Sequence, residues 1–237
     1  SAESDVYKRQ DMDTPAGVAH YLEHKMFDTK EGNALQELAA NGASPNAFTS
    51  NAITGYYFES TEKFEENLRI LLSFVSIPYF TKESVDKEQG IIGQEIGMIE
   101  DDPDWVVFMD LMQALYEKHP VRVSVAGSAE SISHITAETL YACHKAFYDP
   151  SNMVLCVAGD VDPEKICQAA REILPERPGA PVARGDYGAQ EPAEVCQPMI
   201  QREMEVSVPL FQLGFKGEAA PEGEGALRQQ LLGELAC

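Results

Sequence analysis

The chain has no long apolar run and is poor in basic residues. None of its apolar stretches approaches the roughly 18 to 20 residues that a membrane-spanning helix needs. Lysine and arginine number 18 against 39 aspartates and glutamates, which gives a formal net charge of -21. A chain this acidic is repelled by phosphate backbones and by anionic lipid. We therefore expect neither nucleic acid nor a membrane as a partner.

Cysteine is also scarce, and its spacing is irregular. The five cysteines form no C-x-x-C pair, so neither a disulfide framework nor a cysteine zinc knot is indicated. The first ten residues, SAESDVYKRQ, lack the apolar core of a signal peptide. These features predict a reducing compartment, and we assign the protein to the cytoplasm.

Hydrophobic periodicity predicts several helices and a few strands. A capping threonine followed by proline, Thr14-Pro15, indicates the start of an amphipathic helix that carries Val18, Leu22 and Met26. The other predicted helices are 33–40, 64–75, 81–99, 105–116, 136–147, 162–174 and from about 225 onward. The predicted strands lie within 44–60, 153–159 and 204–215.

The first predicted helix carries the order H-x-x-E-H at His20, Glu23 and His24. Histidines four residues apart lie about 40° from each other around a helix, so both imidazoles can reach one ion. The glutamate lies beside such an ion without being forced to bind it. This order is the inverse of the common zinc-protease motif H-E-x-x-H. The alternative is two ordinary surface histidines on one helix face.

A catalytic zinc site usually needs a third protein ligand. The long helix 81–99 offers Glu88 and Glu95, which point the same way because seven residues make about two turns. They lie about 10 Å apart along the axis, so only one can readily join a given ion. The spacing does not decide which one joins, and two solvated glutamates are the alternative.

Three segments together resemble one family, the M16 metallopeptidases of the insulinase and mitochondrial processing peptidase group. The segments are GVAHYLEHKMFDT, GASPNAFTSNAITGYYF and EQGIIGQEIGMIEDDPDW. The likeness runs from about Thr14 to the chain end and is greatest to bacterial insulinase-like proteins. It implies an α+β fold of the LuxS/MPP-like metallohydrolase type, a mixed or antiparallel sheet flanked by helices. We expect the first strands of that sheet to be missing.

The resemblance also assigns roles to the polar residues. It implies that His20, His24 and Glu95 bind one Zn²⁺ per catalytic domain. Glu23 would be the catalytic general base, and Glu88 would orient the site from outside the ligand set.

The strand that contains N-A-F-T resembles the substrate-binding edge of the family. The resemblance implies that Asn46 and Ala47 pair with an extended peptide through backbone hydrogen bonds. The alternative is that both are ordinary sheet positions.

The resemblance gives a domain plan. Residues 1–10 look like a cloning or sequencing scar, and 11–174 would be the M16 catalytic domain. Residues 175–200, rich in proline, glycine and alanine, are linker-like. Residues 201–237 would be the truncated start of a second M16 domain.

The implied function is a zinc-dependent endopeptidase that acts on short or unfolded peptides. The implied partners are peptide substrates and a second M16 half, in cis or as a homologous subunit in trans. The alternatives are a non-catalytic M16-like scaffold or partner subunit, and a fragment that is inactive without its second half.

The acidic surplus predicts a preference for basic peptides through long-range attraction. We expect cleavage of a Lys-rich peptide to slow as salt is added, because the Debye length shrinks from about 30 Å at 0.01 M to about 8 Å at 0.15 M. The measurement compares cleavage rates of a Lys-rich peptide and a neutral peptide of equal length. A Lys-rich rate that does not fall with salt contradicts the prediction.

Overall fold

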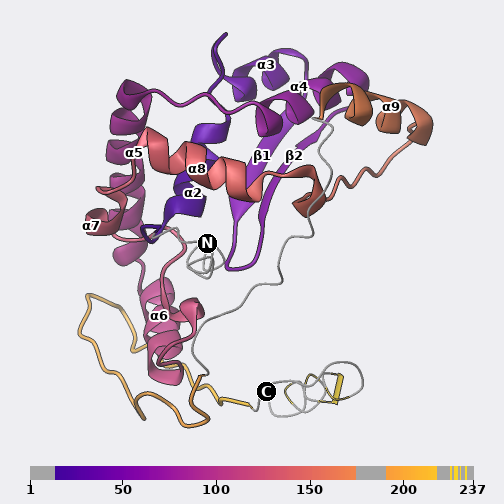
Figure 1. Cartoon of the computed structure of the whole chain (residues 1–237). Coiled ribbons are helices and arrows are strands. Elements are labelled where there is room, and N and C mark those ends of the chain that lie inside the picture. Colours follow the sequence, from indigo (N-terminus) through magenta and orange to yellow (C-terminus); the bar gives the residue numbers. More distant parts are fainter. Residues whose placement is uncertain are drawn as a thin grey trace. The chain divides into compact units, whose positions relative to one another are not determined.

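The structure is a computed structural model (Figure 1). It describes two long stretches and five residues near the C-terminus: 14–174, 191–217, and Gly225, Leu227, Arg228, Gln230 and Gly233. The predicted scar and most of the predicted linker lie outside these residues. The five described residues between 225 and 233 are helical, as predicted for the segment from about 225 onward.

The chain divides into two compact units. The first unit consists of Ser1–Met98 and Val123–Tyr187, and the second of Ile99–Arg122 and Gly188–Cys237. The domain plan that the sequence suggests is a separate matter and stays a prediction.

The described part of the first unit combines helices with one small sheet, which is an α+β composition. Its elements are α2 (Val18–Met26), α3 (Ala34–Ala40), β1 (Ser44–Thr49), β2 (Thr54–Glu59), α4 (Phe64–Ser76), α5 (Lys82–Glu100, whose end belongs to the second unit), α7 (Ala129–Ile132), α8 (Ala137–Phe147), the 3₁₀ turn η3 (Pro150–Asn152) and α9 (Pro163–Ile173).

Helix α2 begins one turn later than Thr14-Pro15 predicts. Its N-cap is Gly17, which has a left-handed φ of 90°. A Cβ atom at this position would lie 2.5 Å from the carbonyl oxygen of Ala126. Only glycine tolerates both the backbone angle and the close approach, so this contact sets the start of the helix. Side chains cap two later helices, Asp162 at the start of α9 and Thr136 at the start of α8.

The sheet is an antiparallel hairpin whose register pairs Asn46 with Tyr57. Helices α2 and α3 contact β1, and α4 contacts β2 (Figure 1). Alternation along both strands turns one face toward these helices. On that face Tyr56 packs against Phe27 and Phe74, and its hydroxyl lies 2.7 Å from that of Tyr148. The hairpin is thereby held against the helices by an aromatic cluster in which Phe27 and Phe74 are buried and the two tyrosines are half-buried.

Two predicted strands, 153–159 and 204–215, are not formed. Both segments are irregular, and several of their apolar side chains are exposed, including Val154 and Phe211. A strand is stable only when a neighbour accepts and donates its backbone hydrogen bonds, and within the described residues β1 and β2 alone make a sheet. Both strand predictions were therefore wrong.

The described part of the second unit holds α6 (Pro103–Leu115) and the 3₁₀ turn η2 (Pro120–Arg122) beside the irregular stretch 191–217. Arg202 forms a two-point ion pair with Asp110, with nitrogen–oxygen distances of 2.9 and 2.7 Å. Gly214 lies so close to α6 that a Cβ atom there would be 3.0 Å from the side chain of Leu111.

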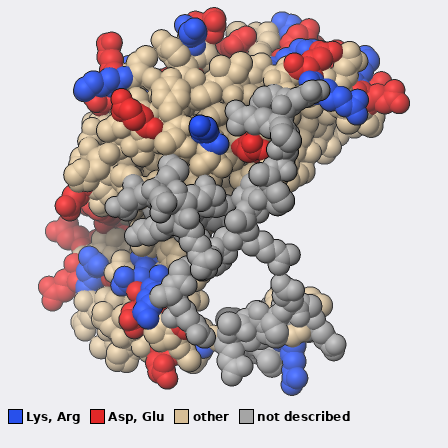
Figure 2. Space-filling view, viewed as in Figure 1, with Lys and Arg blue, Asp and Glu red and all other residues tan. Residues whose placement is uncertain are grey.

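None of the described helices combines the length and the apolar character needed to cross a lipid bilayer. On the face seen in Figure 2, basic side chains stand among the acidic ones. The acidic surplus does not gather into one patch on this face.

Glu191 holds the stretch 191–217 to the loop after α6. Its carboxylate accepts hydrogen bonds from the backbone amides of Glu117, Lys118 and His119, at 2.7 to 2.8 Å, and from Lys216 at 2.6 Å. Burial opposes its charge, but these hydrogen bonds outweigh burial and lower the pKa of Glu191 from 4.5 to about 2.

We predict that these hydrogen bonds of Glu191 stabilise the folded state fully above pH 4.5. Their contribution is lost as the pH falls toward 2, because only the ionised carboxylate accepts all of them and its pKa is lower in the folded state. The protection factors of the three amides in hydrogen exchange should drop across this window. In Glu191→Gln they should be low and independent of pH between these values. Equal pH dependence in both proteins contradicts the prediction.

Candidate metal centre

Helices α2 and α5 bring three potential metal ligands together. On α2, His20 and His24 lie one turn apart with their ring centres 4.7 Å from each other. On α5, Glu95 places one oxygen 3.5 Å from His20 Nε2 and the other 3.5 Å from His24 Nε2. One ligand atom from each residue lies within 4.8 Å of the others. Of the described residues, this is the one such group of three.

The donor set and its spacing fit a zinc ion. Zinc binds imidazole nitrogen and carboxylate oxygen at about 2.0 to 2.2 Å, so neighbouring ligands of a tetrahedral site lie about 3.4 Å apart. Both histidine–glutamate distances of 3.5 Å are close to this value. Burial, and then the neighbouring His24, lower the pKa of His20, which favours the neutral imidazole that metals bind.

Glu88 contacts the other side of His24. Its Oε1 lies 3.1 Å from His24 Nδ1, while Glu95 faces Nε2 of the same ring. This hydrogen bond raises the pKa of His24 and lowers that of Glu88. Residue spacing left open which of the two glutamates meets the histidine pair, whereas the family resemblance implied Glu95. The structure brings Glu95 to Nε2 of both histidines and Glu88 to Nδ1 of His24.

Glu23 lies on the buried side of α2 and has 9% of its surface exposed. Its Oε2 accepts a hydrogen bond of 2.5 Å from the Thr49 hydroxyl at the end of β1. Burial raises the pKa of Glu23, and the Thr49 hydrogen bond partly opposes this. Thr49 was not predicted, although it lies in the N-A-F-T run and shares a strand face with Ala47.

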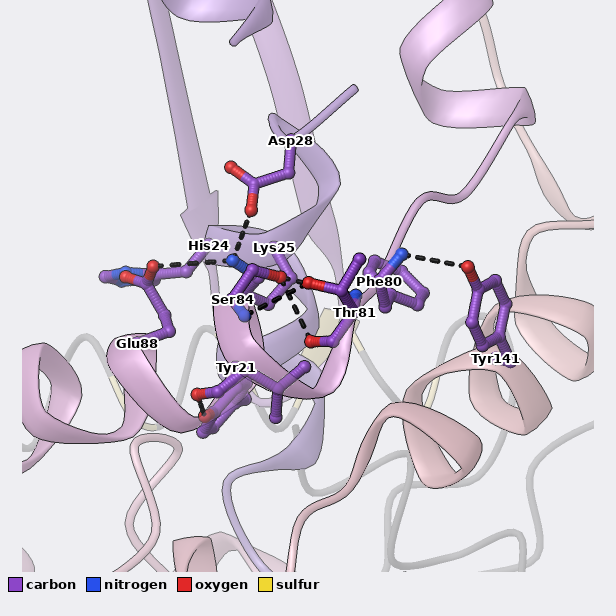
Figure 3. Close-up of polar contacts among 10 residues, drawn as sticks. Tyr21, His24, Lys25, Asp28, Phe80, Thr81, Ser84, Glu88 and Tyr141 are labelled. Atoms are coloured by element: carbon purple, nitrogen blue, oxygen red, sulfur yellow. Dashed lines mark hydrogen bonds and ion pairs between the residues drawn. The ribbon is translucent and has the colours of Figure 1, made fainter. Parts of the chain in front are cut away.

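Lys25 and Asp28 are two further residues that sequence reasoning missed. The Lys25 ammonium hydrogen-bonds Asp28 and lies 3.7 Å from Glu88 Oε2 (Figure 3). Its side chain is only 2% exposed. The signal in the sequence is a lysine and an aspartate three residues apart beside the second histidine, a spacing that allows an ion pair.

Tyr21 fixes the position of α2 along α5. Its buried hydroxyl donates a 2.5 Å hydrogen bond to the carbonyl oxygen of Val85, in the first turn of α5 (Figure 3). Val85 and Glu88 are three residues apart and Glu95 lies seven residues further, so all three lie along one side of α5. The tyrosine therefore sets the register at which the two glutamates meet α2.

Asn46 and Ala47 lie in the middle of β1, and the hydrogen bonds of Asn46 are local. The Asn46 amide donates to the Tyr57 hydroxyl at 3.1 Å, and its oxygen accepts from the Ala47 backbone amide at 2.9 Å. In the described part of the chain, β1 pairs only with β2, so its other edge has no strand neighbour. Their predicted contact with a peptide stays a prediction.

Two family models match the chain. The model described as Insulinase (Peptidase family M16) covers residues 8–129, and the model described as Peptidase M16 inactive domain covers 134–235. The uncharacterized zinc protease YmfH of Bacillus subtilis is 48% identical over 171 residues, which are 72% of this chain and 40% of that protein. The chain thus spans about two fifths of the length of this relative.

Solved structures agree with these matches. A crystal structure described as that of an M16-like peptidase from Alicyclobacillus acidocaldarius superposes with a TM-score of 0.71 at 40% identity, over 78% of this chain and 44% of that one. The first half of the periplasmic protease PqqL from Escherichia coli gives a TM-score of 0.61 at 26% identity, over 69% of this chain and 37% of that one. The fold is therefore that of M16-like peptidases.

We predict that Thr49→Val destabilises the fold because it leaves the buried Glu23 carboxylate without its hydroxyl donor. The expected loss is about 1 to 3 kcal/mol in the free energy of unfolding. Thr49→Ser keeps the hydroxyl and is the matched control, with most of the stability retained. Urea unfolding of the three proteins measures the effect. Equal losses of unfolding free energy in the valine and serine variants would show that the destabilisation does not come from the missing hydrogen bond.

Proposed function

This chain belongs to peptidase family M16, and we propose that it supplies the zinc-binding and proton-transferring groups of an endopeptidase acting on short or unfolded peptides. The observation that supports this most directly is that His20 and His24, on the helix that also carries Glu23, meet Glu95 of α5. Relatives named zinc proteases support the same assignment.

In this proposal His20, His24 and Glu95 hold one zinc ion. When bound, zinc supplies Lewis acidity that lowers the pKa of a water molecule and polarises a peptide carbonyl. The two histidines contribute neutral nitrogens, and Glu95 contributes the single negative charge of the ligand set. Glu88 keeps His24 oriented through Nδ1, which leaves Nε2 for the metal.

Glu23 moves the proton. It accepts a proton from the attacking water as the oxygen adds to the peptide carbonyl, and it returns that proton to the nitrogen when the carbon–nitrogen bond breaks. Glu23 lies three residues after His20 on α2, a spacing that makes the two side chains neighbours, and its carboxyl interacts electrostatically with His24 and Glu95. The Thr49 hydroxyl holds one of its oxygens and leaves the other for water.

The open edge of β1 is the proposed site for the peptide. An extended chain can add to such an edge through backbone hydrogen bonds, which gives affinity with little selection of side chains. Asn46 and Ala47 lie in the middle of this strand and are the proposed contact residues.

A second M16 half is the proposed partner, in cis or as a homologous subunit. The match of residues 134–235 to a second M16 model and the likeness to the first half of PqqL support a two-half protein. Within this proposal, 11–174 is the catalytic domain, 175–200 the linker and 201–237 the start of the next domain; the second family model begins earlier, at residue 134. The cytoplasm is the proposed compartment.

We predict that the chain purifies with about one zinc ion when no chelator is used, because three ligands are already close together. Glu23→Gln should keep the metal and lose about 100-fold or more in peptide cleavage, because it removes the proton acceptor but no ligand. Metal analysis and a fluorogenic peptide assay of the full-length gene product measure the two effects.

His20→Asn is the matched control, since it should lose both zinc and cleavage. An absence of zinc from the wild-type protein contradicts the proposal. Cleavage by Glu23→Gln at the wild-type rate would keep the metal site and remove Glu23 from the mechanism.

A further inference from the structure

Lys25 is a buried cation that the proposed mechanism does not use. It follows His24 directly on α2, and its side chain is almost completely enclosed. An ammonium group is costly to bury unless negative partners surround it. Its two partners therefore indicate what the lysine does.

One partner is local and the other comes from α5. Asp28, three residues along the chain, accepts a hydrogen bond from the ammonium group. Glu88 places Oε2 at 3.7 Å, which is an ion-pair distance longer than a direct hydrogen bond. Asp28 alone could neutralise the lysine, so it is the additional contact with Glu88 that indicates a role of Lys25 at the metal centre (Figure 3).

The Glu88 carboxylate is held at both oxygens by consecutive residues of α2. Oε1 contacts His24 Nδ1 at 3.1 Å, and Oε2 faces Lys25. Because a carboxylate is planar, attraction of one oxygen toward Lys25 restricts where the other can point. The hydrogen bond to His24 in turn directs His24 Nε2 toward Glu95.

We propose that Lys25 is a positioning residue of the metal centre: by attracting one oxygen of Glu88 it aims the other at His24 and so fixes the orientation of a metal ligand. The inference rests on the proposed function, because it concerns the same metal. It adds a residue outside the ligand set that acts through Glu88 and touches neither metal nor substrate.

Two effects of Lys25 on metal binding oppose each other. Its positive charge repels a divalent cation, whereas its hold on Glu88 improves the ligand geometry. Residues that orient metal ligands typically contribute about 10- to 100-fold in metal affinity. A double-mutant cycle separates the two effects, because the direct repulsion is present whether or not position 88 is charged and cancels in the cycle.

The cycle uses wild type, Lys25→Met, Glu88→Gln and the double variant, each first freed of metal. Methionine keeps most of the buried length of lysine, and glutamine keeps an oxygen for His24 but removes the charge that attracts Lys25. Zinc affinity is measured by competition with a chromophoric chelator. The visible spectrum of the Co²⁺-substituted proteins reports the ligand geometry independently of activity.

We expect Lys25→Met to weaken zinc binding about 10-fold in the wild-type background and to change the Co²⁺ spectrum. In the Glu88→Gln background the same substitution should leave zinc binding unchanged or tighter, since only the repulsion is lost. Lys30→Met, which removes an exposed lysine five residues further on, is the control for net charge and should match wild type.

The outcomes separate the two proposals. If wild type binds no zinc, the proposed function and this inference both fail. If wild type binds zinc and Lys25→Met changes zinc affinity by the same factor in both backgrounds, only the role of Lys25 is overturned. Should Lys25→Met not fold, the cycle is run in the Asp28→Asn background, where no unpaired carboxylate is left at position 28, with the same expectations.

Discussion

The packing of one face of α2 against one face of α5 is the contact on which the metal centre depends. Tyr21 anchors the two helices through the Val85 carbonyl, and the histidines and glutamates then meet at successive turns. Both helices repeat every 3.6 residues, so one fixed contact near the start of α5 sets all the others. The ligands come from segments 71 residues apart in the chain, from His24 to Glu95, and this packing is what joins them.

The centre is also a problem of charge burial. Glu23, Glu88 and Glu95 bring three carboxylates to the helix pair, and burial disfavours the charges of Glu23 and Glu88. Each is compensated differently: Thr49 donates a hydrogen bond to Glu23, His24 and Lys25 face Glu88, and Glu95 keeps 39% of its side chain exposed. These carboxylates supply the negative charge of the proposed cation site.

Membership of the M16 family and the geometry of the site support each other without being the same kind of evidence. The family match covers the motif helix and α5, and the structure independently brings their polar residues into contact. Lys25 and Thr49 lie outside the residues that the resemblance assigned. Their roles follow from two contacts in the structure, Lys25 with Asp28 and Thr49 with Glu23.

Helix-borne features could be predicted from the sequence because helical hydrogen bonds and side-chain spacing are local. The position of His20, Glu23 and His24 on one helix, and the shared direction of Glu88 and Glu95, followed from residue spacing alone. Contacts between distant segments were decided by the tertiary structure. It brought Glu95 to Nε2 of both histidines. It also set the start of α2 at Gly17 through a close backbone contact with Ala126, and it left 153–159 and 204–215 without strand partners. A strand or an ion pair needs a second segment, and its approach is set by packing that no local pattern encodes.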